Sequence, residues 1–333
     1  MKTRRFGRMG WELSEIGFGA WAIGGWWGDQ KDEASLDALR KYLDLGGNFI
    51  DTAQAYGDGH SERLINKILK ERKDRIYVAT KLPPIDREWS PPSWTPFEHT
   101  FPLDYVVKGV ETSLKNLGVE AIDVYQLHTW CETWNVADEL FETLIKLKQE
   151  GKILAIGIST TESYPECVIP ALQTGVIDAL QVIFNLFEQH PRETLLPVCE
   201  QHDVGVIIRV PFDEGALTGK YKGDETFTDD DFRSIYFHGD NLKATVQRVE
   251  KIREWAERNT PGMSLAELAL RWILSHSETD VVIPGIRTVR HAEWNTAPSD
   301  GRILTPGQLR DLRRFAWRRN PWWEDLPLLE ESV

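Results

Sequence analysis

Residues 49–62 read FIDTAQAYGDGHSE, an apolar run that ends in an acid and continues through a glycine-containing loop. The apolar run predicts a buried strand, which places the Asp51 carboxylate at its end, and Tyr56 follows five residues later. Gly57 and Gly59 permit the left-handed backbone that a tight strand-to-helix connection needs. Ser61 is a residue type that commonly caps helices. The stretch therefore predicts a strand–loop–helix unit with an acid and a phenol where the strand ends.

The same alternation of apolar runs and amphipathic segments recurs along the 333 residues. Several runs are rich in Ile and Val without strict alternation, which is typical of parallel strands buried on both faces. The predicted strands are 16–21, 48–53, 76–81, 122–128, 154–159, 179–185, 204–210 and 281–286, and the predicted helices are 34–45, 62–69, 105–117, 137–149, 164–173, 193–201 and 265–275. Alternation alone also fits a doubly wound open sheet, but eight strands favour a closed (β/α)8 barrel. We interpret residues 1–333 as a single α/β domain of this kind.

Additional segments extend this barrel at both ends. Residues 3–13 predict a short β-hairpin that turns at Met9-Gly10 and could plug the bottom of the barrel. Residues 82–102, 129–136 and 211–239 exceed ordinary loop lengths, and each follows the carboxyl end of a predicted strand. That face carries the active sites of such barrels. The tail from Pro306, with one more helix and then PWWEDLPLLEESV, could fold back over the same face.

Composition excludes several classes of function. A formal net charge of −13 repels phosphate backbones, so we expect no nucleic-acid partner. The three cysteines include no CxxC pair, which argues against a disulfide framework or a zinc knuckle. We find no signal peptide and no apolar run near the roughly 18 residues that span a bilayer. We therefore expect a cytoplasmic protein with reduced thiols, no membrane segment and small-molecule partners; its oligomeric state stays open.

Polar residues stand at the ends of three consecutive predicted strands. Asp51 ends the second strand with Tyr56 beyond it, Lys81 ends the third, and His128 ends the fourth. Each has another interpretation. Asp51 could cap a helix, Tyr56 and His128 could belong to the core, and Lys81 could be solvated at a strand edge. In a barrel, however, neighbouring strand ends face one mouth, so the four groups would meet there.

These four groups suit a proton transfer. A tyrosine hydroxyl has a pKa of about 10, and an ammonium within hydrogen-bond reach lowers it. A buried lysine needs a carboxylate to hold its charge, which is the role that we assign to Asp51 beside Lys81. His128 could orient a carbonyl oxygen near the Tyr56 hydroxyl. Such a site protonates an oxygen that becomes an alkoxide, and it requires a cofactor because proteins have no hydride donor of their own.

Several motifs together resemble a known family. DTAQAYGDGHSE, VATK and YQLH, with SEIGFGAWAIGG, GKILAIGIST, VPFDEGALTGKY and VIPGIRT, are similar to the motifs of the aldo-keto reductase superfamily over almost the whole chain. The resemblance implies a (β/α)8 barrel that uses NADPH or NADH to reduce aldehydes or ketones, or catalyses the reverse reaction. It implies Tyr56 as proton donor, Lys81 and Asp51 as the residues that tune it, and His128 as the residue that orients the substrate carbonyl.

The resemblance also implies the cofactor-binding positions. They are Gly19, Ala20, Trp21, Ser159, Thr160, Gln181, Arg209, Pro211, Phe212, Gly215, Leu217, Lys220, Gly285, Arg287, Thr288, His291 and Asn295. Arg287 lies where the family binds a 2′-phosphate, which favours NADP(H) and leaves NAD(H) as the competing cofactor. Thr160, Arg209 and Trp294 depart from the family pattern, in which Asn, a nicotinamide-stacking aromatic residue and Glu are common at these positions.

Tryptophan is unusually frequent, with 14 residues, several of them in predicted loops. Aromatic side chains in loops often line ligand pockets, although they can equally cover a core. We expect the substrate pocket to contain Trp21, Trp26, Trp27, Trp89 and Trp130. The sequence leaves the substrate and the physiological direction open.

Two other functions fit parts of the pattern. A regulatory or sensor subunit of the same fold would bind NADP with little turnover. A barrel hydrolase or lyase would use Asp51 and His128 with a metal ion. The pair of His128 and Cys131 has no further ligands nearby in the sequence, so we predict no metal site.

Overall fold

The computed structural model describes residues 1–25, 27–28, 30–320 and 324–329. Within these residues, eight parallel strands form one curled sheet in the order β10-β9-β8-β7-β6-β5-β4-β3. They are β3 Phe18–Gly19, β4 Phe49–Asp51, β5 Tyr77–Leu82, β6 Ile122–Leu127, β7 Ile153–Ser159, β8 Ala179–Ile183, β9 Gly205–Arg209 and β10 Val281–Val282. Parallel bridges from Ile16 to Val282 and from Gly19 to Gly285 join the two edges of the sheet. The predicted (β/α)8 barrel is therefore confirmed.

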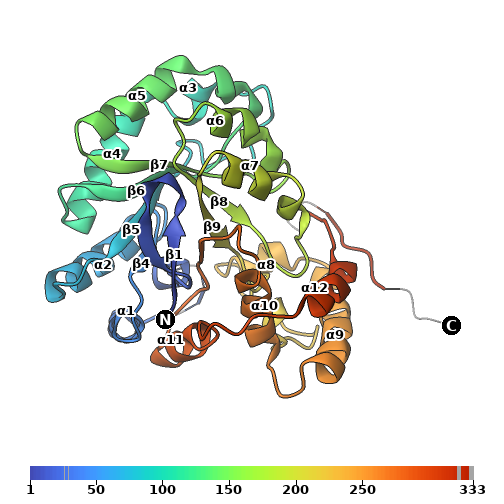
Figure 1. The fold of residues 1–333 in the computed structure, drawn as a ribbon. Helices are drawn as coiled ribbons and strands as arrows, with labels where there is room; N and C mark the ends of the chain where they lie inside the picture. Colours follow the sequence, from blue (N-terminus) through green and yellow to red (C-terminus); the bar gives the residue numbers. More distant parts are fainter. Residues whose placement is uncertain (26, 29, 321–323, 330–333) are drawn as a thin grey trace.

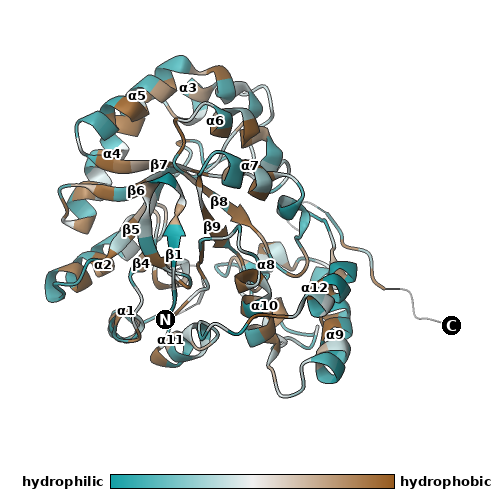
Figure 2. Cartoon of the chain, in the orientation of Figure 1, coloured by the Kyte–Doolittle hydropathy of each residue, from teal (hydrophilic) through white to brown (hydrophobic). Residues whose placement is uncertain are grey.

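Helices surround the ring of strands (Figure 1). The longer ones are α1 Asp32–Asp44, α2 His60–Glu71, α4 Leu103–Leu117, α5 Asp138–Gln149, α6 Ile169–Gln173, α7 Leu195–Gln201, α9 Asn241–Asn259, α10 Leu265–Leu274, α11 Val289–Thr296 and α12 Pro306–Leu312. Figure 2 shows that hydrophilic residues dominate the outer turns of these helices. Neither α9 nor α11 was predicted from the sequence. The helix predicted at 164–173 is divided into the 3-10 helix η4 Pro165–Val168 and α6, because Pro170 lacks the N–H that a continuous helix needs.

The N-terminal hairpin closes the lower end of the barrel. It consists of β1 Thr3–Phe6 and β2 Trp11–Ser14, joined by η1 Gly7–Met9, and Figure 1 shows it in dark blue across the middle of the ring. The buried cluster inside the barrel comprises Phe6 and Leu13 of the hairpin with Phe49, Ala79, Val124, Ala155, Ala179, Ile207, Val281 and Ile283. The Phe6 ring approaches Gly205 so closely that a Cβ there would lie 2.6 Å from it. The predicted plug is confirmed.

The inward positions become polar nearer the carboxyl ends of the strands. Asp51, Lys81, Gln126 and Gln181 each lie two residues after a member of the apolar cluster. Since alternate residues of a strand face the same side, all four point into the barrel. All four are buried. A polar layer therefore rests on the apolar layer that the hairpin seals.

The long connections follow β5, β6 and β9, as predicted, and contain α3 Phe97–Thr100, η3 Glu132–Val136, and η6 Ala216–Thr218 with α8 Arg233–Tyr236. After η7 Arg313–Phe315 the tail returns to this face. The Trp317 N–H donates to the Phe187 carbonyl at 2.8 Å, and the Arg319 guanidinium pairs with Asp213 beyond β9. Trp322 and Trp323 lie outside the described residues. Among the described helices, none is long and apolar enough to cross a membrane.

Candidate active site

An ion pair between Lys81 and Asp51 lies at the centre of the polar layer. Lys81 Nζ is 2.5 Å from Asp51 Oδ1, and the two side chains are 0% and 2% exposed. The same ammonium donates to the Thr52 carbonyl at 2.7 Å and to the Tyr56 hydroxyl at 3.3 Å. Burying a charge is costly unless it is paired and hydrogen-bonded. Three ammonium donors are satisfied here, and one of them contacts the tyrosine hydroxyl.

The loop after β4 holds Tyr56 over this ion pair. Gly57 and Gly59 adopt left-handed φ angles of 64° and 79°, as predicted. A Cβ on Gly24 would come within 2.6 Å of Tyr56 Cβ, so glycine at this position permits the close approach of the tyrosine. The loop position of Tyr56 is therefore fixed by the backbones on both sides of it.

Ser61 serves a purpose other than the predicted helix cap. The helix α2 begins at His60, and its N-cap residue is Gly59, which makes no side-chain capping bond. The Ser61 hydroxyl is buried, accepts a hydrogen bond from Thr52 Oγ1 at 2.8 Å and donates to the Ala20 carbonyl at 3.3 Å. The predicted cap is wrong, because this hydroxyl ties together the residues that follow β3 and β4.

Burial raises the pKa of the Tyr56 hydroxyl above its usual value, and the charge of Lys81 opposes this rise without cancelling it. The expectation of a lowered pKa is wrong as a net effect, since the removal of water outweighs the attraction of the ammonium. Tyr56 therefore keeps its proton at neutral pH. That is the form required of a proton donor.

His128 lies beside the Tyr56 ring, with the ring centroids 6.0 Å apart, and the Trp89 ring contacts it at 4.9 Å. Burial and the positive charges of Lys81 and Arg209 lower the pKa of His128 well below its usual value. The imidazole is therefore neutral at pH 7 and can donate one N–H without carrying a charge. Among the described residues, Nδ1 has no hydrogen-bond partner.

The second oxygen of Asp51 accepts hydrogen bonds from two amides. Gln181 Nε2 is 2.7 Å and Gln126 Nε2 is 3.3 Å from Asp51 Oδ2, and Gln181 Nε2 is 3.4 Å from Gln126 Oε1. The resemblance pointed to Gln181, but the sequence analysis did not identify Gln126. Its signal was a glutamine near the end of the buried strand IDVYQL.

Aromatic rings cover the mouth above these groups. The Trp21 ring lies nearly parallel to Tyr56 at 6.2 Å between centroids, and it contacts Trp27 at 5.8 Å and Phe232 at 4.4 Å. Phe232 comes from the connection after β9 and was not predicted. Together with Trp89 over His128, these rings form an apolar roof on the polar layer.

One of the predicted pocket tryptophans is absent from this roof, and another is not described. Trp130 has no exposed surface and packs against Trp134 and Phe141, so its side chain belongs to the core. We therefore remove it from the pocket. Trp26 lies outside the described residues.

Four predicted cofactor residues lie side by side at the ends of β7, β8 and β9. Ser159 pairs in register with Gln181, and the Thr160 N–H donates to the Gln181 carbonyl at 3.0 Å. The Arg209 guanidinium donates to Glu162 at 2.9 Å and to the Thr160 carbonyl at 3.1 Å. The buried hydroxyl and amide groups of this set are suited to bind a carboxamide.

The loop that follows Arg209 has an unusual backbone. Val210, Asp213 and Glu214 adopt φ angles of 54°, 48° and 53°, and Gly215 follows at 92°. Left-handed conformations of this kind are strained for residues other than glycine and cluster at functional sites. Of the other predicted residues in this loop, Pro211 is buried, Phe212 is partly buried against the core, and Leu217 is fully packed in it.

Positive charge gathers beside this loop. The Lys220 ammonium lies over Gly215, where an added Cβ would come within 2.7 Å of Nζ. Lys220 is exposed, but desolvation of its ammonium beside the loop, followed by the charges of Arg233 and Arg287, lowers its pKa to about 8. Burial, followed by Arg287 and Lys220, also lowers the pKa of His291. Such crowding of cations favours binding of an anion such as a phosphate group. The sequence analysis did not identify Arg233.

The segment after β10 brings the remaining predicted residues to the same edge. The Gly19 N–H donates to the Pro284 carbonyl at 3.0 Å. A Cβ added to Gly285 would meet no atom within 4 Å. This open backbone can accept a close ligand. Asn295 donates to the Gly285 carbonyl at 3.2 Å, and Thr288 caps α11.

Arg287 is held by a residue that the sequence analysis missed. Its Nε donates to Gln30 Oε1 at 3.1 Å, and Gln30 Nε2 donates back to the Arg287 carbonyl at 2.9 Å. Trp294 is more than half exposed and stacks on the Arg290 guanidinium. Among the described residues, no group of three or more His, Cys, Asp or Glu could hold a metal ion.

Comparison of the sequence with known proteins identifies related chains. The model of the aldo/keto reductase family matches residues 15–313. Aldo-keto reductase YhdN of Bacillus subtilis is 34% identical over 283 residues, which cover 84% of this chain and 82% of that protein. The NADH-specific methylglyoxal reductase of Escherichia coli is 28% identical over 316 residues, which cover 89% of this chain and 93% of that protein.

Solved structures show the same likeness. The glycerol dehydrogenase AKR11B4 from Gluconobacter oxydans aligns with a TM-score of 0.77 and 30% identity, over 99% of both chains. An aldo-keto reductase from Klebsiella pneumoniae in complex with NADPH aligns with a TM-score of 0.68 and 25% identity, again over 99% of both chains.

Proposed function

The chain belongs to the aldo/keto reductase family, and on this premise we propose that it is an NADP(H)-dependent oxidoreductase that interconverts a carbonyl compound and its alcohol. One observation carries the proposal. Lys81 Nζ contacts both Asp51 Oδ1, at 2.5 Å, and the Tyr56 hydroxyl, at 3.3 Å, inside a buried mouth. A buried cation that contacts a protonated phenol is an arrangement for proton transfer to oxygen.

Each of the four residues has a distinct role in the proposed reaction. When it is bound, a nicotinamide supplies the hydride that reaches the carbonyl carbon. Tyr56 donates its proton to the carbonyl oxygen, and Lys81 stabilises the tyrosinate that remains. Asp51 keeps Lys81 charged in the absence of water. The neutral imidazole of His128 donates an N–H to the same oxygen and so fixes its position. In the reverse direction, the tyrosinate accepts the proton of the alcohol.

The positive charge around Lys220, Arg233 and Arg287 supports NADP(H) as the preferred cofactor. Lys220 and Arg287 beside a strained loop suit the phosphates of such a cofactor, while Arg233 is already paired with Asp231; guanidinium groups bind phosphate through paired donors. The Klebsiella pneumoniae relative binds NADPH, whereas the Escherichia coli relative is NADH-specific, so the family uses both cofactors. The aromatic roof favours carbonyl compounds with apolar or ring-shaped substituents.

The variant Tyr56→Phe tests the proposal. We expect turnover on a panel of aldehydes and ketones to fall by a factor on the order of 10²–10⁴, the usual contribution of a positioned acid. NADPH affinity, followed by tryptophan fluorescence, should stay within twofold of the parent. Tyr164→Phe removes the hydroxyl of a tyrosine that is 48% exposed and serves as the control.

Full turnover in Tyr56→Phe would disprove the assigned role. Tight NADPH binding by a parent protein that turns over no carbonyl compound would instead support a sensor subunit of the same fold.

A further inference from the structure

Gln126 is a buried amide within the motif YQLH, and neither the resemblance nor the proposed proton transfer gives it a role. It lies on β6 with no exposed surface and points into the barrel. Burial of an amide is unfavourable unless its polar atoms are hydrogen-bonded. The neighbouring strand leaves room for it, because a Cβ on Gly157 would come within 2.7 Å of Gln126 Cγ. The fold therefore sets aside space in a crowded interior for this side chain.

The hydrogen bonds of Gln126 lead to Asp51. Gln126 Nε2 donates to Asp51 Oδ2 at 3.3 Å, on the side of the carboxylate opposite Lys81. Gln181 donates to the same oxygen at 2.7 Å. Donors from β5, β6 and β8 thus surround one carboxylate, and this fixes the direction of Oδ1 as well as that of Oδ2.

We infer that Gln126 is a positioning residue, which holds Asp51 so that the Lys81 ammonium stays against the Tyr56 hydroxyl. The inference rests on the proposed function, because it concerns the same proton donor. Within the described part of the chain, no hydrogen bond joins the Gln126 side chain to Tyr56 or Lys81, although Lys81 is its register partner on β5, so its polar atoms act through Asp51 and Gln181. Without its N–H, the carboxylate keeps Lys81 on one oxygen and Gln181 on the other, but it is held less firmly on the side of β6.

Loss of the Gln126 hydrogen bond should shift the pKa of Tyr56 in one direction, upward. Two charges act on its hydroxyl in opposite directions, and the effect of Lys81, which favours the tyrosinate, exceeds that of Asp51. A carboxylate that is held less firmly supports the buried ammonium less well. Loss of Gln126 therefore makes ionisation of Tyr56 harder.

A fluorine titration of the protein alone measures this effect. Incorporation of 3-fluorotyrosine lowers the phenol pKa into an accessible pH range, and Tyr56→Phe identifies the ¹⁹F signal of residue 56. In Gln126→Met, which keeps the side-chain length and removes both polar atoms, we expect the midpoint to rise by about one pH unit, the size of one hydrogen bond to a charged group. Gln189→Met removes a buried amide whose Nε2 donates to the Leu186 and Leu312 carbonyls, and its midpoint should match that of the parent.

An unchanged or lowered midpoint in Gln126→Met would overturn the inference, as would an equal rise in Gln189→Met. If Gln126→Met does not fold, Gln126→Asn keeps a shorter amide, and a smaller rise is expected; no rise overturns the inference. In steady-state assays kcat should fall about tenfold with the KM for NADPH unchanged, the size of one such hydrogen bond. A parent without carbonyl turnover would refute the proposed function, while the fluorine titration would still decide the role of Gln126.

Discussion

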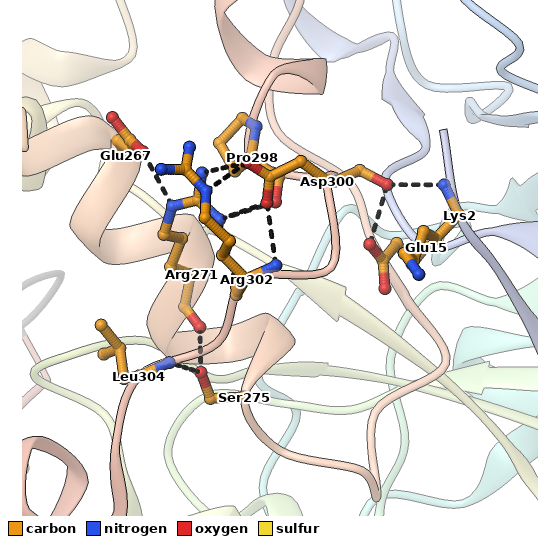
Figure 3. A network of polar contacts seen from close by, with 10 residues as sticks. Lys2, Glu15, Glu267, Arg271, Ser275, Pro298, Asp300, Arg302 and Leu304 are labelled. Carbon is orange, nitrogen blue, oxygen red and sulfur yellow. Dashed lines mark hydrogen bonds and ion pairs between the residues drawn. The ribbon is translucent and has the colours of Figure 1, made fainter.

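The buried cations Lys81 and Arg271 are both paired with a carboxylate, but the two ion pairs have different roles. Arg271 lies on α10 and is 2% exposed. It donates to both oxygens of Asp300, at 2.8 and 3.0 Å, and to the carbonyls of Pro298 and Arg302, at 3.1 and 2.8 Å (Figure 3). The fork of the guanidinium thereby fastens the segment after α11 onto α10. Each of these partners is an acceptor that keeps its protonation state at neutral pH.

Lys81 differs from Arg271 because one of its partners can change its protonation state. Of the three atoms that its ammonium contacts, two are fixed acceptors and the third is the Tyr56 hydroxyl, which can lose a proton. The charge of an ammonium acts as a point, so it influences whichever atom lies closest. Burial of an ion pair therefore does not itself indicate a catalytic role. A further partner that can exchange a proton, as the Tyr56 hydroxyl can, does indicate one.

The largest expected effect is the loss of turnover in Lys81→Met. Removal of the ammonium leaves the tyrosinate of Tyr56 without its stabilising charge, so we expect kcat to fall by a factor on the order of 10³. Arg271→Met removes an equally buried cation and should retain more than half of the parental kcat in the folded fraction. Steady-state kinetics of both variants at one pH make the measurement. Loss of turnover in both variants to the same extent would abolish the distinction between the two ion pairs.

Arg271→Met should instead have its main effect on stability. Removal of the guanidinium leaves the buried Pro298 and Arg302 carbonyls without this donor, while Asp300, which is about a third exposed, keeps its bonds from Arg302; we expect the free energy of unfolding to drop by about 1–3 kcal/mol. Denaturant unfolding followed by circular dichroism measures the difference. An unchanged midpoint would show that the network in Figure 3 is not needed to join its two segments.

The loss of stability in Arg271→Met should depend on pH, and its direction follows from the pKa of the Asp300 carboxyl. Arg271 holds the pKa of the Asp300 carboxyl well below its usual range. A carboxyl with a depressed folded-state pKa contributes stability above its unfolded pKa of about 3.9, and this contribution disappears as the pH falls toward the folded-state value. The difference between parent and Arg271→Met should therefore shrink below about pH 4. A difference that grows in acid would contradict the assignment.

A substitution within a third set of cations should have the smallest effect, and it extends the comparison between Lys81 and Arg271. Lys220 and Arg287 lie near Arg233, which is itself paired with Asp231, so this set combines neighbouring cations with one ion pair. If they bind the 2′-phosphate, Arg287→Ala should reduce the preference for NADPH over NADH about tenfold, the effect of one charged hydrogen bond. Fluorescence titrations with both cofactors measure the ratio, and Arg290→Ala, three residues further along the chain in α11, is the control. Equal weakening of both cofactors would exclude a phosphate-specific role for Arg287.

The sequence alone predicted the barrel, because strand alternation and strand number are recorded locally in the chain. Eight apolar runs, the hairpin at 3–13 and the long connections all agree with the structure. Parallel strands bring their carboxyl ends to one mouth, so the common location of Asp51, Lys81 and His128 also followed from the sequence.

Other features required the tertiary structure. Gln126 faces Asp51 because of the register between β5 and β6, which no local pattern states. Phe232 and Arg233 reach the mouth from residues 211–239, a segment without a clear period. Trp130 turned out to be core. By contrast, α9 was missed although its buried Leu242, Val249, Ile252 and Ala256 recur at helical spacing, so the sequence did carry that signal.

The protonation state of Tyr56 shows where prediction from the sequence ends and the tertiary structure is needed. The sequence determined which groups meet, since strand order and strand ends fix their neighbours. It could not determine whether burial or Lys81 dominates the pKa of Tyr56, because desolvation depends on every atom that displaces water around the hydroxyl. Connectivity along the chain sets the composition of the site, whereas packing among residues distant in sequence sets its electrostatics.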